Sequence, residues 1–425
     1  MTNQSAMSGK NLEMKRVTRD FESLSRNDVL DRASGHVFSS GLMDSANALC
    51  VANMKYGLAK IHHALFQLGM EPDATFVGAP DATVTRNVKR WNSGLGYGGK
   101  LSWGDGDRKV IFLDSMPNAC GMLVGGLDNL PKIDSLIDNI STVLGSEEVI
   151  DDVVIEWDFA VSNHFIDLYR HKPLDEEADS SYRYIFVIHG SVPELKGDNS
   201  THFGFGLYRH KSPILSEMAE EIDTPFGKTW VVKDEAAVEY LKLNDFACEL
   251  SRKKRLHAAE AIFGEFTEIC NPIHQGLQNM NHHLLGCQNI TEDGNLLPIA
   301  LRADLPAYLV KGKPNFDVEA VEHLGFTRRA ERYGVSHRLL RANILPHGGG
   351  YKFDSILGIN RVIESKGGTR HYVTDMSTGH ESEKVFSNPR ELEYSYRGRE
   401  VVRRAVNLNM CEIVARLMPR FILKI

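Results

Sequence analysis

The sequence predicts a mixed α/β protein of the α+β kind. Short apolar runs typical of strands alternate along the chain with segments that have helical periodicity. Of the 425 residues, 42% are hydrophobic, which is enough for a large core, and the chain has no internal repeat or low-complexity tract. Interleaved strands and helices favour one mixed domain over two separable halves.

The first half of the chain begins with a polar stretch. We expect residues 1–40 to form a peripheral segment and residues 41–425 to form one domain. Leu42 to Met70 has apolar residues at helical spacing and no proline, which predicts a buried helix. Residues 71–107 are rich in Gly, Pro and Asp, which is typical of loops. After them, KVIFLDS (109–115) predicts a buried strand and residues 131–147 predict a helix.

The second half alternates between the two kinds of element. VVIEWDFAV (153–161) and YRYIFVIHG (182–190) predict strands. We expect a helical insertion at about 234–285, broken at Asn271–Pro272. LLPIALRADLPAYLV (296–310) is strand-like, residues 318–342 are helical or turn-rich, and the tail predicts a helix that ends in a short strand.

Composition excludes several classes of protein. No apolar run is long enough to span a bilayer, and the first residues lack the apolar core of a signal peptide, so we expect a cytosolic protein. The six cysteines form no CxxC pair, which argues against a disulfide framework and a zinc ribbon. The net charge is −7, so any RNA contact must use a local basic patch. Three such patches lie at 87–91, 251–257 and 328–341.

Four candidate functional residues stand at the ends of apolar runs, where a scaffold presents groups to a cleft. They are Cys120, His164, His189 and His347. A fifth feature is the pair His282–His283 in a segment with a helical pattern. Thiolate, imidazole and carboxylate ligands together suit Mn, Fe, Co or Zn. Each residue taken alone is more often structural, so the pattern does not identify a metal site by itself.

The stretch ILPHGGGYKF (344–353) puts three glycines directly after a histidine. Bare amides at Gly348, Gly349 and Gly350 suit a cradle for phosphate oxygens beside the nucleophilic imidazole of His347. The alternative is an ordinary tight turn with an exposed histidine.

Six motifs in order resemble those of the RtcB-type RNA ligases, over roughly residues 95–425. NACGM resembles the family's Cys-Gly motif, NHFID its Asn-His-Phe motif followed by an acid, and IHGS its His-Ser-Gly-Ser strand end. NHHLL resembles a paired-histidine segment and HGGG the His-Gly-Ala-Gly motif. VARLMPRFILKI resembles the family's last segment with its penultimate lysine, and SYRGREVV supplies a tyrosine before the last helix.

This resemblance implies an RtcB-like fold, with central β-sheets flanked by helices around a buried metal and nucleotide cleft. It implies an enzyme that uses GTP and two Mn²⁺ ions to join RNA 3′-phosphate or 2′,3′-cyclic phosphate ends to 5′-hydroxyl ends. We expect a monomer, although the sequence itself does not give the oligomeric state. His347 would carry GMP covalently. The implied metal ligands are Cys120, His164, His189, His283 and Asp114. The implied nucleotide-binding residues are Asn163, Phe165, Asp167, Gly348, Gly349, Gly350, Tyr396 and Lys424.

The chain also departs from the family. Pro117 stands where the family has a metal-binding aspartate, so Asp114 or Asn118 would replace that ligand, or one metal would bind weakly. Asp167 is shorter than the family's glutamate, and Tyr351 replaces an arginine. Three alternatives therefore stay open: a metal-dependent RNA cyclic-phosphate phosphodiesterase, an inactive RNA-end binding protein, and a metal hydrolase unrelated to RNA.

Overall fold

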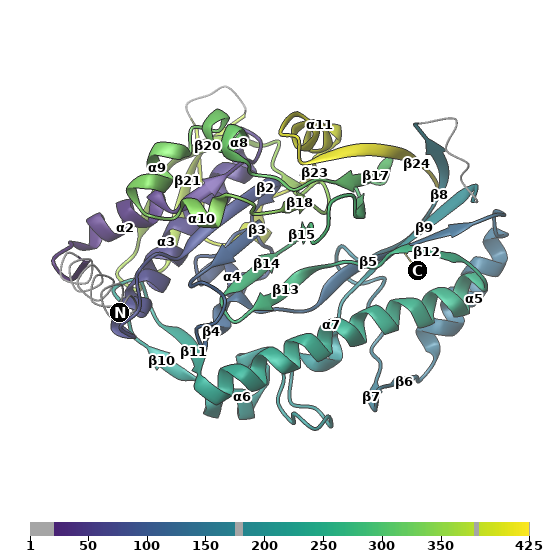
Figure 1. Ribbon diagram of the computed structural model, residues 1–425, viewed down its shortest axis with the longest axis horizontal. Helices are drawn as coiled ribbons and strands as arrows, with labels where there is room; N and C mark the ends of the chain where they lie inside the picture. Colours follow the sequence, from purple (N-terminus) through teal and green to yellow (C-terminus); the bar gives the residue numbers. More distant parts are fainter. Residues whose placement is uncertain (1–20, 175–181, 378–381, 425) are drawn as a thin grey trace, which may run out of the picture.

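A curled 12-stranded sheet forms the centre of the protein, as a computed structural model describes it for residues 21–174, 182–377 and 382–424 (Figure 1). All its pairings are antiparallel except β1 with β2. The strands follow the order β1 (Val37–Ser39), β2 (Thr75–Thr83), β3 (Tyr97–Ser102), β14 (His282–Leu285), β13 (Ile273–Asn279), β5 (Cys120–Leu127), β9 (Tyr184–Gly190), β8 (Phe165–Pro173), β24 (Cys411–Leu423), β17 (Ala307–Gly312) and β16 (Leu296–Ile299), and β12 (Thr267–Cys270) pairs with β5.

Three long helices cover this sheet. α7 (Asp234–Phe263) runs alongside β5 and β13 and contacts both, and it also contacts α5 (Ile133–Gly145), whereas α3 (Ser45–Gln67) packs on β2 (Figure 1). The N-terminus of α3 is capped by Asp44, whose side chain accepts a hydrogen bond from the backbone N–H of Asn47. A largely antiparallel sheet with helices packed on it is an α+β arrangement, which confirms the predicted class.

Shorter elements complete the fold. The remaining helices are α2 (Arg26–Gly35), α4 (Val88–Asn92), α6 (Pro213–Met218), α8 (Val318–His323), α9 (Thr327–Arg332), α10 (Ser336–Leu339) and α11 (Arg399–Asn407). The small sheets are β10 (Glu220–Ile222) with β11 (Thr229–Lys233) and β4 (Val110–Phe112), β15 (Cys287–Asn289) with β18 (Ile344–Pro346), β19 (Tyr351–Lys352) with β23 (Ser395–Tyr396), β20 (Ile356–Glu364) with β21 (Arg370–Met376) and β22 (Glu383–Phe386), and β6 (Val149–Ile150) with β7 (Val153–Val154).

Several predicted elements are confirmed. The helix predicted over Leu42–Met70 is α3, the one over 131–147 is α5, and the strand over 182–190 is β9. The region 296–310 contains two strands, β16 and the beginning of β17. The predicted terminal helix is α11, and the strand after it is longer than expected, with 13 residues in β24.

Several sequence predictions were wrong, among them the strand over 153–161, of which only Val153–Val154 (β7) is a strand. Within the predicted peripheral segment 1–40, β1 pairs with β2 and Phe38 is fully buried, while residues 1–20 lie outside the described part. The predicted loop region 71–107 contains β2, every residue of which is buried, and β3. The helix predicted to about residue 285 ends at Phe263, and β12, β13 and β14 follow.

Close packing explains why the glycines at 98–99 misled the prediction of loops. A Cβ atom on Gly99 would lie 2.5 Å from the Phe76 ring and from the Val77 carbonyl oxygen on the neighbouring strand. The glycine is therefore needed inside a strand, where two backbones approach closely, rather than in a turn.

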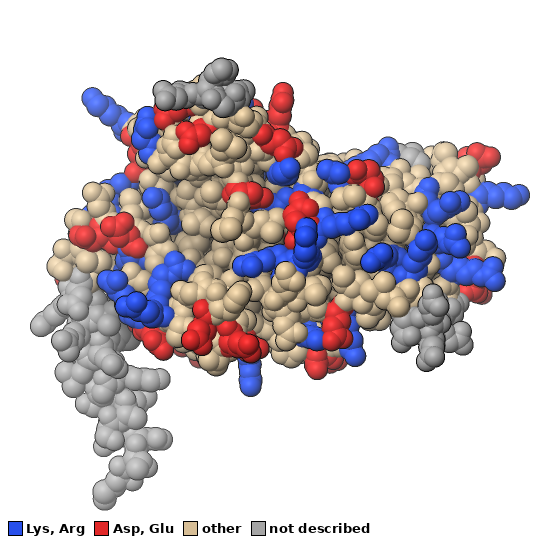
Figure 2. Space-filling model, turned by 90° about the horizontal axis from the view of Figure 1, so that it is seen from above, with Lys and Arg blue, Asp and Glu red and all other residues tan. Residues whose placement is uncertain are grey.

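Two further properties of the molecule bear on function. Within the described residues, no helix combines the length and the apolar character required to cross a bilayer. Figure 2 shows Lys and Arg side chains predominating toward the right of one face, whereas acidic and basic side chains are mixed on the left. Basic surface is therefore concentrated locally even though the net charge of the chain is −7.

Candidate metal and nucleotide site

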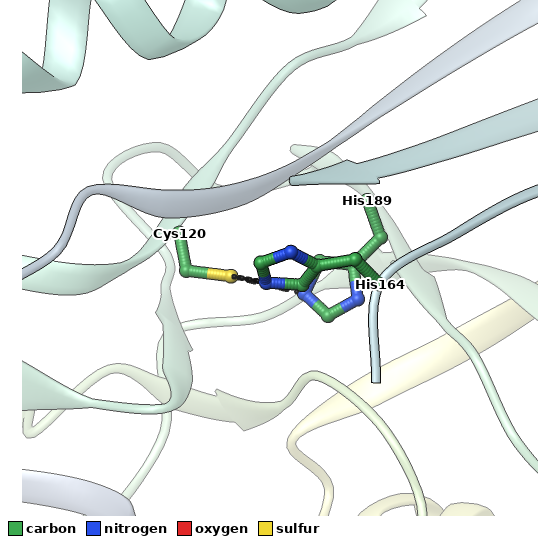
Figure 3. Close-up of side chains that lie close together, drawn as sticks. All are labelled: Cys120, His164 and His189. Atoms are coloured by element: carbon green, nitrogen blue, oxygen red, sulfur yellow. Dashed lines mark hydrogen bonds between the residues drawn. The ribbon is translucent and has the colours of Figure 1, made fainter. Parts of the chain in front are cut away.

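A cysteine and two histidines meet at one end of three neighbouring strands. Cys120 begins β5, His189 lies near the end of β9, and His164 directly precedes β8. The Cys120 Sγ lies 3.1 Å from Nε2 of His189 and 3.4 Å from Nε2 of His164, and all three residues are buried (Figure 3). Adjacent antiparallel strands bring these three side chains together although they are up to 69 positions apart in the sequence.

The outward-facing nitrogen of each histidine is held by the protein. Nδ1 of His164 lies 3.0 Å from the Asp158 carboxylate, and Nδ1 of His189 lies 3.2 Å from the carbonyl oxygen of Asn163. The contact to Asn163 puts the proton of His189 on Nδ1, so its Nε2 presents a lone pair toward the thiol. The Asp158 contact fixes the ring of His164, whose Nε2 would give up its proton when a metal binds. Metal-binding histidines in proteins are commonly oriented by such partners.

The pKa values of His164 and His189 are both shifted from their ordinary values. Burial alone would lower the pKa of His164, but the thiolate of Cys120 and the carboxylate of Asp158 raise it to about 10. Burial, and then the positive charge of His164, hold the pKa of His189 well below its ordinary value. The protein surroundings thus shift the pKa values of the two imidazoles in opposite directions.

His274 is a fourth histidine at this site, and the sequence analysis missed it. Its Nε2 lies 3.3 Å from Nε2 of His189, and its ring centre lies 4.5 Å from that of His347. The register of β13 against β5 shifts between Ile273 and Gln275, directly beside Cys120. Such an irregularity re-aims a side chain, and here it accompanies the entry of His274 into the site.

His347 is held by a buried carboxylate on β2. Its Nδ1 lies 2.9 Å from Oδ2 of Asp81, and the same oxygen accepts the backbone N–H of His347 at 3.1 Å. The Asp81 side chain is completely buried. Because Nδ1 donates to Asp81, Nε2 of His347 keeps its lone pair and can act as a nucleophile.

The three glycines after His347 are required by the protein itself. A Cβ atom on Gly349 would lie 2.4 Å from the carbonyl oxygen of Arg397. Gly350 has a φ of 66°, and a Cβ atom there would lie 2.5 Å from the carbonyl oxygen of Asp81. The glycines thus let this loop pack tightly against two neighbouring segments, and they also line the cavity described next.

A cavity of about 280 Å³ connects these groups. Both His347 and His189 line it. All the predicted nucleotide-binding residues line it as well, namely Asn163, Phe165, Asp167, Gly348, Gly349, Gly350, Tyr396 and Lys424. Residues from β8, β9, β23 and the end of the chain therefore surround one space with the nucleophile candidate.

Two charged side chains in this cavity come from β8 and from the residue after β24. Asp167 accepts hydrogen bonds from Tyr169 Oη at 2.9 Å and from the backbone N–H of Leu423 at 3.3 Å. Burial raises its pKa to about 7 in spite of these bonds. Lys424 donates through Nζ to the carbonyl oxygen of Ser162 at 2.8 Å and to that of His164. The tail is thus anchored at the site.

Two predicted metal ligands lie elsewhere. Asp114 binds Nζ of the buried Lys60 at 2.6 Å and the hydroxyl of Thr229 at 2.9 Å, so its carboxylate neutralises a lysine. His283 is fully buried on β14, where neither ring nitrogen has a hydrogen-bond partner among the described residues. Neither residue belongs to the Cys120–His164–His189 group, and the other proposed substitute, Asn118, caps the backbone N–H of Cys120 at 3.1 Å.

The basic run at 328–341 also lies outside the site. Arg338 is buried and binds the carboxylate of Asp73 at 2.7 Å, and Arg329 lies over the ring of Phe38. These arginines therefore stabilise packing between segments, and none of the run lines the cavity.

The donor atoms fit one metal ion. One sulfur and two nitrogens lie within 4.8 Å of one another. In tetrahedral coordination, with metal–sulfur and metal–nitrogen bonds of about 2.3 and 2.0 Å, such donors lie roughly 3.5 Å apart. Among the described residues no second group of three donors occurs, and no carboxylate joins this one. Thiolate and imidazole ligands suit Zn or Co better than Mn²⁺. Because the described residues contain one such group, the second of the two predicted Mn²⁺ ions has no ligand group among them.

Comparison with known proteins gives no family assignment. A scan against protein-family models finds no match, and a search of curated proteins finds none either.

Proposed function

We propose that the protein is an RNA ligase that joins 3′-phosphate or 2′,3′-cyclic phosphate ends to 5′-hydroxyl ends through a covalent histidine–GMP intermediate. The observation that supports this best is the shared cavity, which is lined by His347, Lys424 and His189, a member of the metal-binding group. This convergence joins segments from residue 120 to residue 424, whose motifs resemble those of the RtcB-type ligases.

In the first step, the lone pair on Nε2 of His347 attacks the α-phosphorus of GTP. A nitrogen–phosphorus bond forms, the bond to the bridging oxygen breaks, and pyrophosphate leaves. Asp81 supports this step because its carboxylate holds the proton on Nδ1 and stabilises the positive charge that develops on the ring. No further base is required, since Nε2 carries no proton.

The cavity offers partners for each part of the nucleotide. An ionised Asp167 can accept hydrogen bonds from N1–H and the amino group of guanine, because each carboxylate oxygen has a second lone pair. The rings of Phe165 and Tyr396 supply apolar surface for the base and sugar. Lys424 uses two of its three N–H donors on backbone carbonyls, which leaves one for a phosphate oxygen.

A divalent ion held by Cys120, His164 and His189 would neutralise phosphate charge beside His347. His274 lies between the two halves of the site, and burial, followed by the proximity of His347 and His189, holds its pKa well below the ordinary value. The neutral ring of His274 therefore separates the nucleophile from the charged metal group without adding a third positive charge.

In the later steps, an oxygen of the RNA 3′-phosphate displaces His347 from the guanylyl phosphorus and regenerates the free imidazole. A 2′,3′-cyclic end first adds water at phosphorus and loses its bond to the 2′-oxygen, which takes up a proton. The 5′-hydroxyl of the second strand then attacks the activated 3′-phosphate, and GMP leaves with the hydroxyl proton. Both transfers occur at phosphorus, so one cationic cavity can serve them in sequence.

Incubation with GTP labelled at the α-phosphate tests the proposal. The purified chain supplied with Mn²⁺, Zn²⁺ or Co²⁺ should retain acid-labile, base-stable label, and the variant His347→Ala should retain none. His337→Ala is a matched control, because His337 is exposed, lies near Asp105 and does not line the cavity. If the chain opens a cyclic phosphate but retains no GMP label, the result would instead indicate the phosphodiesterase alternative.

A further inference from the structure

A second, larger cavity of about 850 Å³ adjoins the nucleotide cavity and is built differently. The two cavities share a wall, formed by Tyr97, Ser162, Asn163, Tyr351 and Tyr396. The larger cavity is also lined by His164, a member of the metal-binding group. A ligand in the larger cavity therefore has access to the same metal group from a second side.

Positive charge dominates the larger cavity. Its lining includes five Lys and Arg side chains, which are Arg86, Arg90, Lys196, Lys211 and Arg390. The only two acidic residues in the lining are Glu156 and Asp158, and the latter is already paired with His164. Such a surplus of positive charge in one cavity of a protein whose net charge is −7 indicates a polyanionic ligand.

Arg86 has a buried hydrogen-bond donor, Nη1, that lacks an acceptor among the described residues. Its guanidinium carbon lies 4.1 Å from the ring centre of Tyr394, and Nε of Arg390 donates to its backbone carbonyl at 2.9 Å. A buried guanidinium nitrogen without an acceptor is costly, and a phosphate oxygen would satisfy it.

Aromatic rings lie directly beside this charge. Tyr351 stacks on Tyr396 with ring centres 5.4 Å apart, and Tyr394 meets both rings edge-on at 5.0 and 5.7 Å. Tyr394 is 43% exposed, so part of its ring remains open to a ligand. Aromatic rings that alternate with basic side chains are typical of sites for single-stranded nucleic acid, because an unpaired base can stack while the backbone meets cations.

We propose that this second cavity binds the unpaired end of the RNA strand that carries the 3′-phosphate, with Arg86 on a backbone phosphate and Tyr394 stacked on a base. This inference rests on the proposed ligase function and specifies which form of RNA that function uses. The strand would approach past His164, which lines this cavity, so its terminal phosphate would lie near the residues that would hold the metal and beside the nucleotide cavity. A base-paired end lacks a free base face and would lose the stacking contact.

Fluorescence anisotropy with a labelled single-stranded oligoribonucleotide that ends in a 3′-phosphate tests this on the full-length, metal-loaded chain. Arg86→Ala and Tyr394→Ala should each weaken binding about tenfold, a range typical of the loss of one phosphate or one stacking contact. Tyr394→Phe should bind like the parent chain, because it keeps the ring. Arg328→Ala is the matched control, since this exposed arginine lines neither cavity.

The salt dependence of binding adds a second measurement. Arg86→Ala should reduce the slope of log affinity against log salt by about one phosphate contact, whereas Tyr394→Ala should leave the slope unchanged. Wild-type affinity in both Arg86→Ala and Tyr394→Ala would overturn the inference. Equal affinity for a blunt duplex of the same sequence would overturn the selection of an unpaired end.

Labelling of His347 by GTP separates this inference from the function on which it rests. A chain that takes up the label but binds RNA independently of Arg86 and Tyr394 refutes the inference alone. A chain that never takes up the label, yet binds RNA through these two residues, refutes the ligase proposal and supports the binding cavity.

Discussion

Replacement of Asp81 by asparagine tests the proposal that this carboxylate activates His347. The Oδ2 atom of Asp81 accepts from Nδ1 of His347 at 2.9 Å and from the backbone N–H groups of His347 and Gly348 at 3.1 and 3.4 Å. In the variant Asp81→Asn an amide oxygen can still accept from the backbone. The change therefore removes the negative charge while keeping the shape of the loop.

The expected effects differ in size for stability and for reactivity. A hydrogen bond to a charged group contributes roughly 1.5–3 kcal/mol and a neutral one roughly 0.5–1.5 kcal/mol, so Asp81→Asn should lower the free energy of unfolding by about 1–2 kcal/mol. The positive charge that develops on His347 loses its counter-charge, and the amide can also donate to Nδ1 and favour the tautomer with a protonated Nε2. Together these effects should slow GTP labelling between tenfold and several hundredfold.

Single-turnover labelling with α-labelled GTP at saturating concentration measures the rate, and urea unfolding measures the stability. Asp73→Asn is the matched control, because Asp73 is another buried carboxylate, bound to Arg338 and outside the cavity. It should lose stability while it labels at the parent rate. If Asp81→Asn labels as fast as the parent chain, Asp81 does not activate His347 and the reasoning is refuted.

Three further predictions concern ligands and pH. Asp114→Asn should lower the free energy of unfolding by roughly 3–5 kcal/mol, because it leaves the buried Lys60 without its counter-charge. Its metal content, measured by inductively coupled plasma mass spectrometry, should be unchanged, and loss of the metal would show that Asp114 is a ligand. His274→Ala should slow GTP labelling, whereas His283→Ala should only lower thermal stability. The opposite pattern would show that His283, and not His274, belongs to the site. The pKa of Asp167 is raised by burial from 3.8 to about 7, so its contribution to stability is greatest below pH 3.8 and declines by at most about 4 kcal/mol as the pH rises through 7. Asp167→Asn should lack this decline in urea unfolding, and in the parent chain labelling should increase with pH through about 7 as the carboxylate becomes able to accept from guanine.

The residues that sequence reasoning located share a recognisable setting. Cys120, His164, His189 and His347 each follow or end an apolar run, and the antiparallel order of β5, β9 and β8 brings three of these ends together. The strand ends could be located from the sequence, but their convergence depends on β9 lying antiparallel between β5 and β8. The terminal Lys424 was found through the resemblance and is held by backbone carbonyls beside His164.

The residues that sequence reasoning missed depend on tertiary detail. His274 lies inside β13, and only the register shift beside Cys120 accompanies its entry into the site. Asp81 lies in β2, a strand whose Gly and Pro content is typical of loops and whose complete burial removes the alternation of polar and apolar residues. Asp114 stands six residues before Cys120, but the contact with Lys60, contributed by α3, directs it away from the metal group. Neither a bulge nor a long-range ion pair leaves a local signal in the sequence.

The central claim is that one cavity binds GTP between His347 and the Cys120–His164–His189 group. A crystal structure of the chain soaked with a divalent metal and a non-hydrolysable GTP analogue, with anomalous data recorded for the metal, tests it most directly. We predict an anomalous peak bonded to Sγ of Cys120 and both Nε2 atoms, and an α-phosphate in line with Nε2 of His347. A nucleotide bound elsewhere, or a metal peak away from Cys120, would contradict the claim.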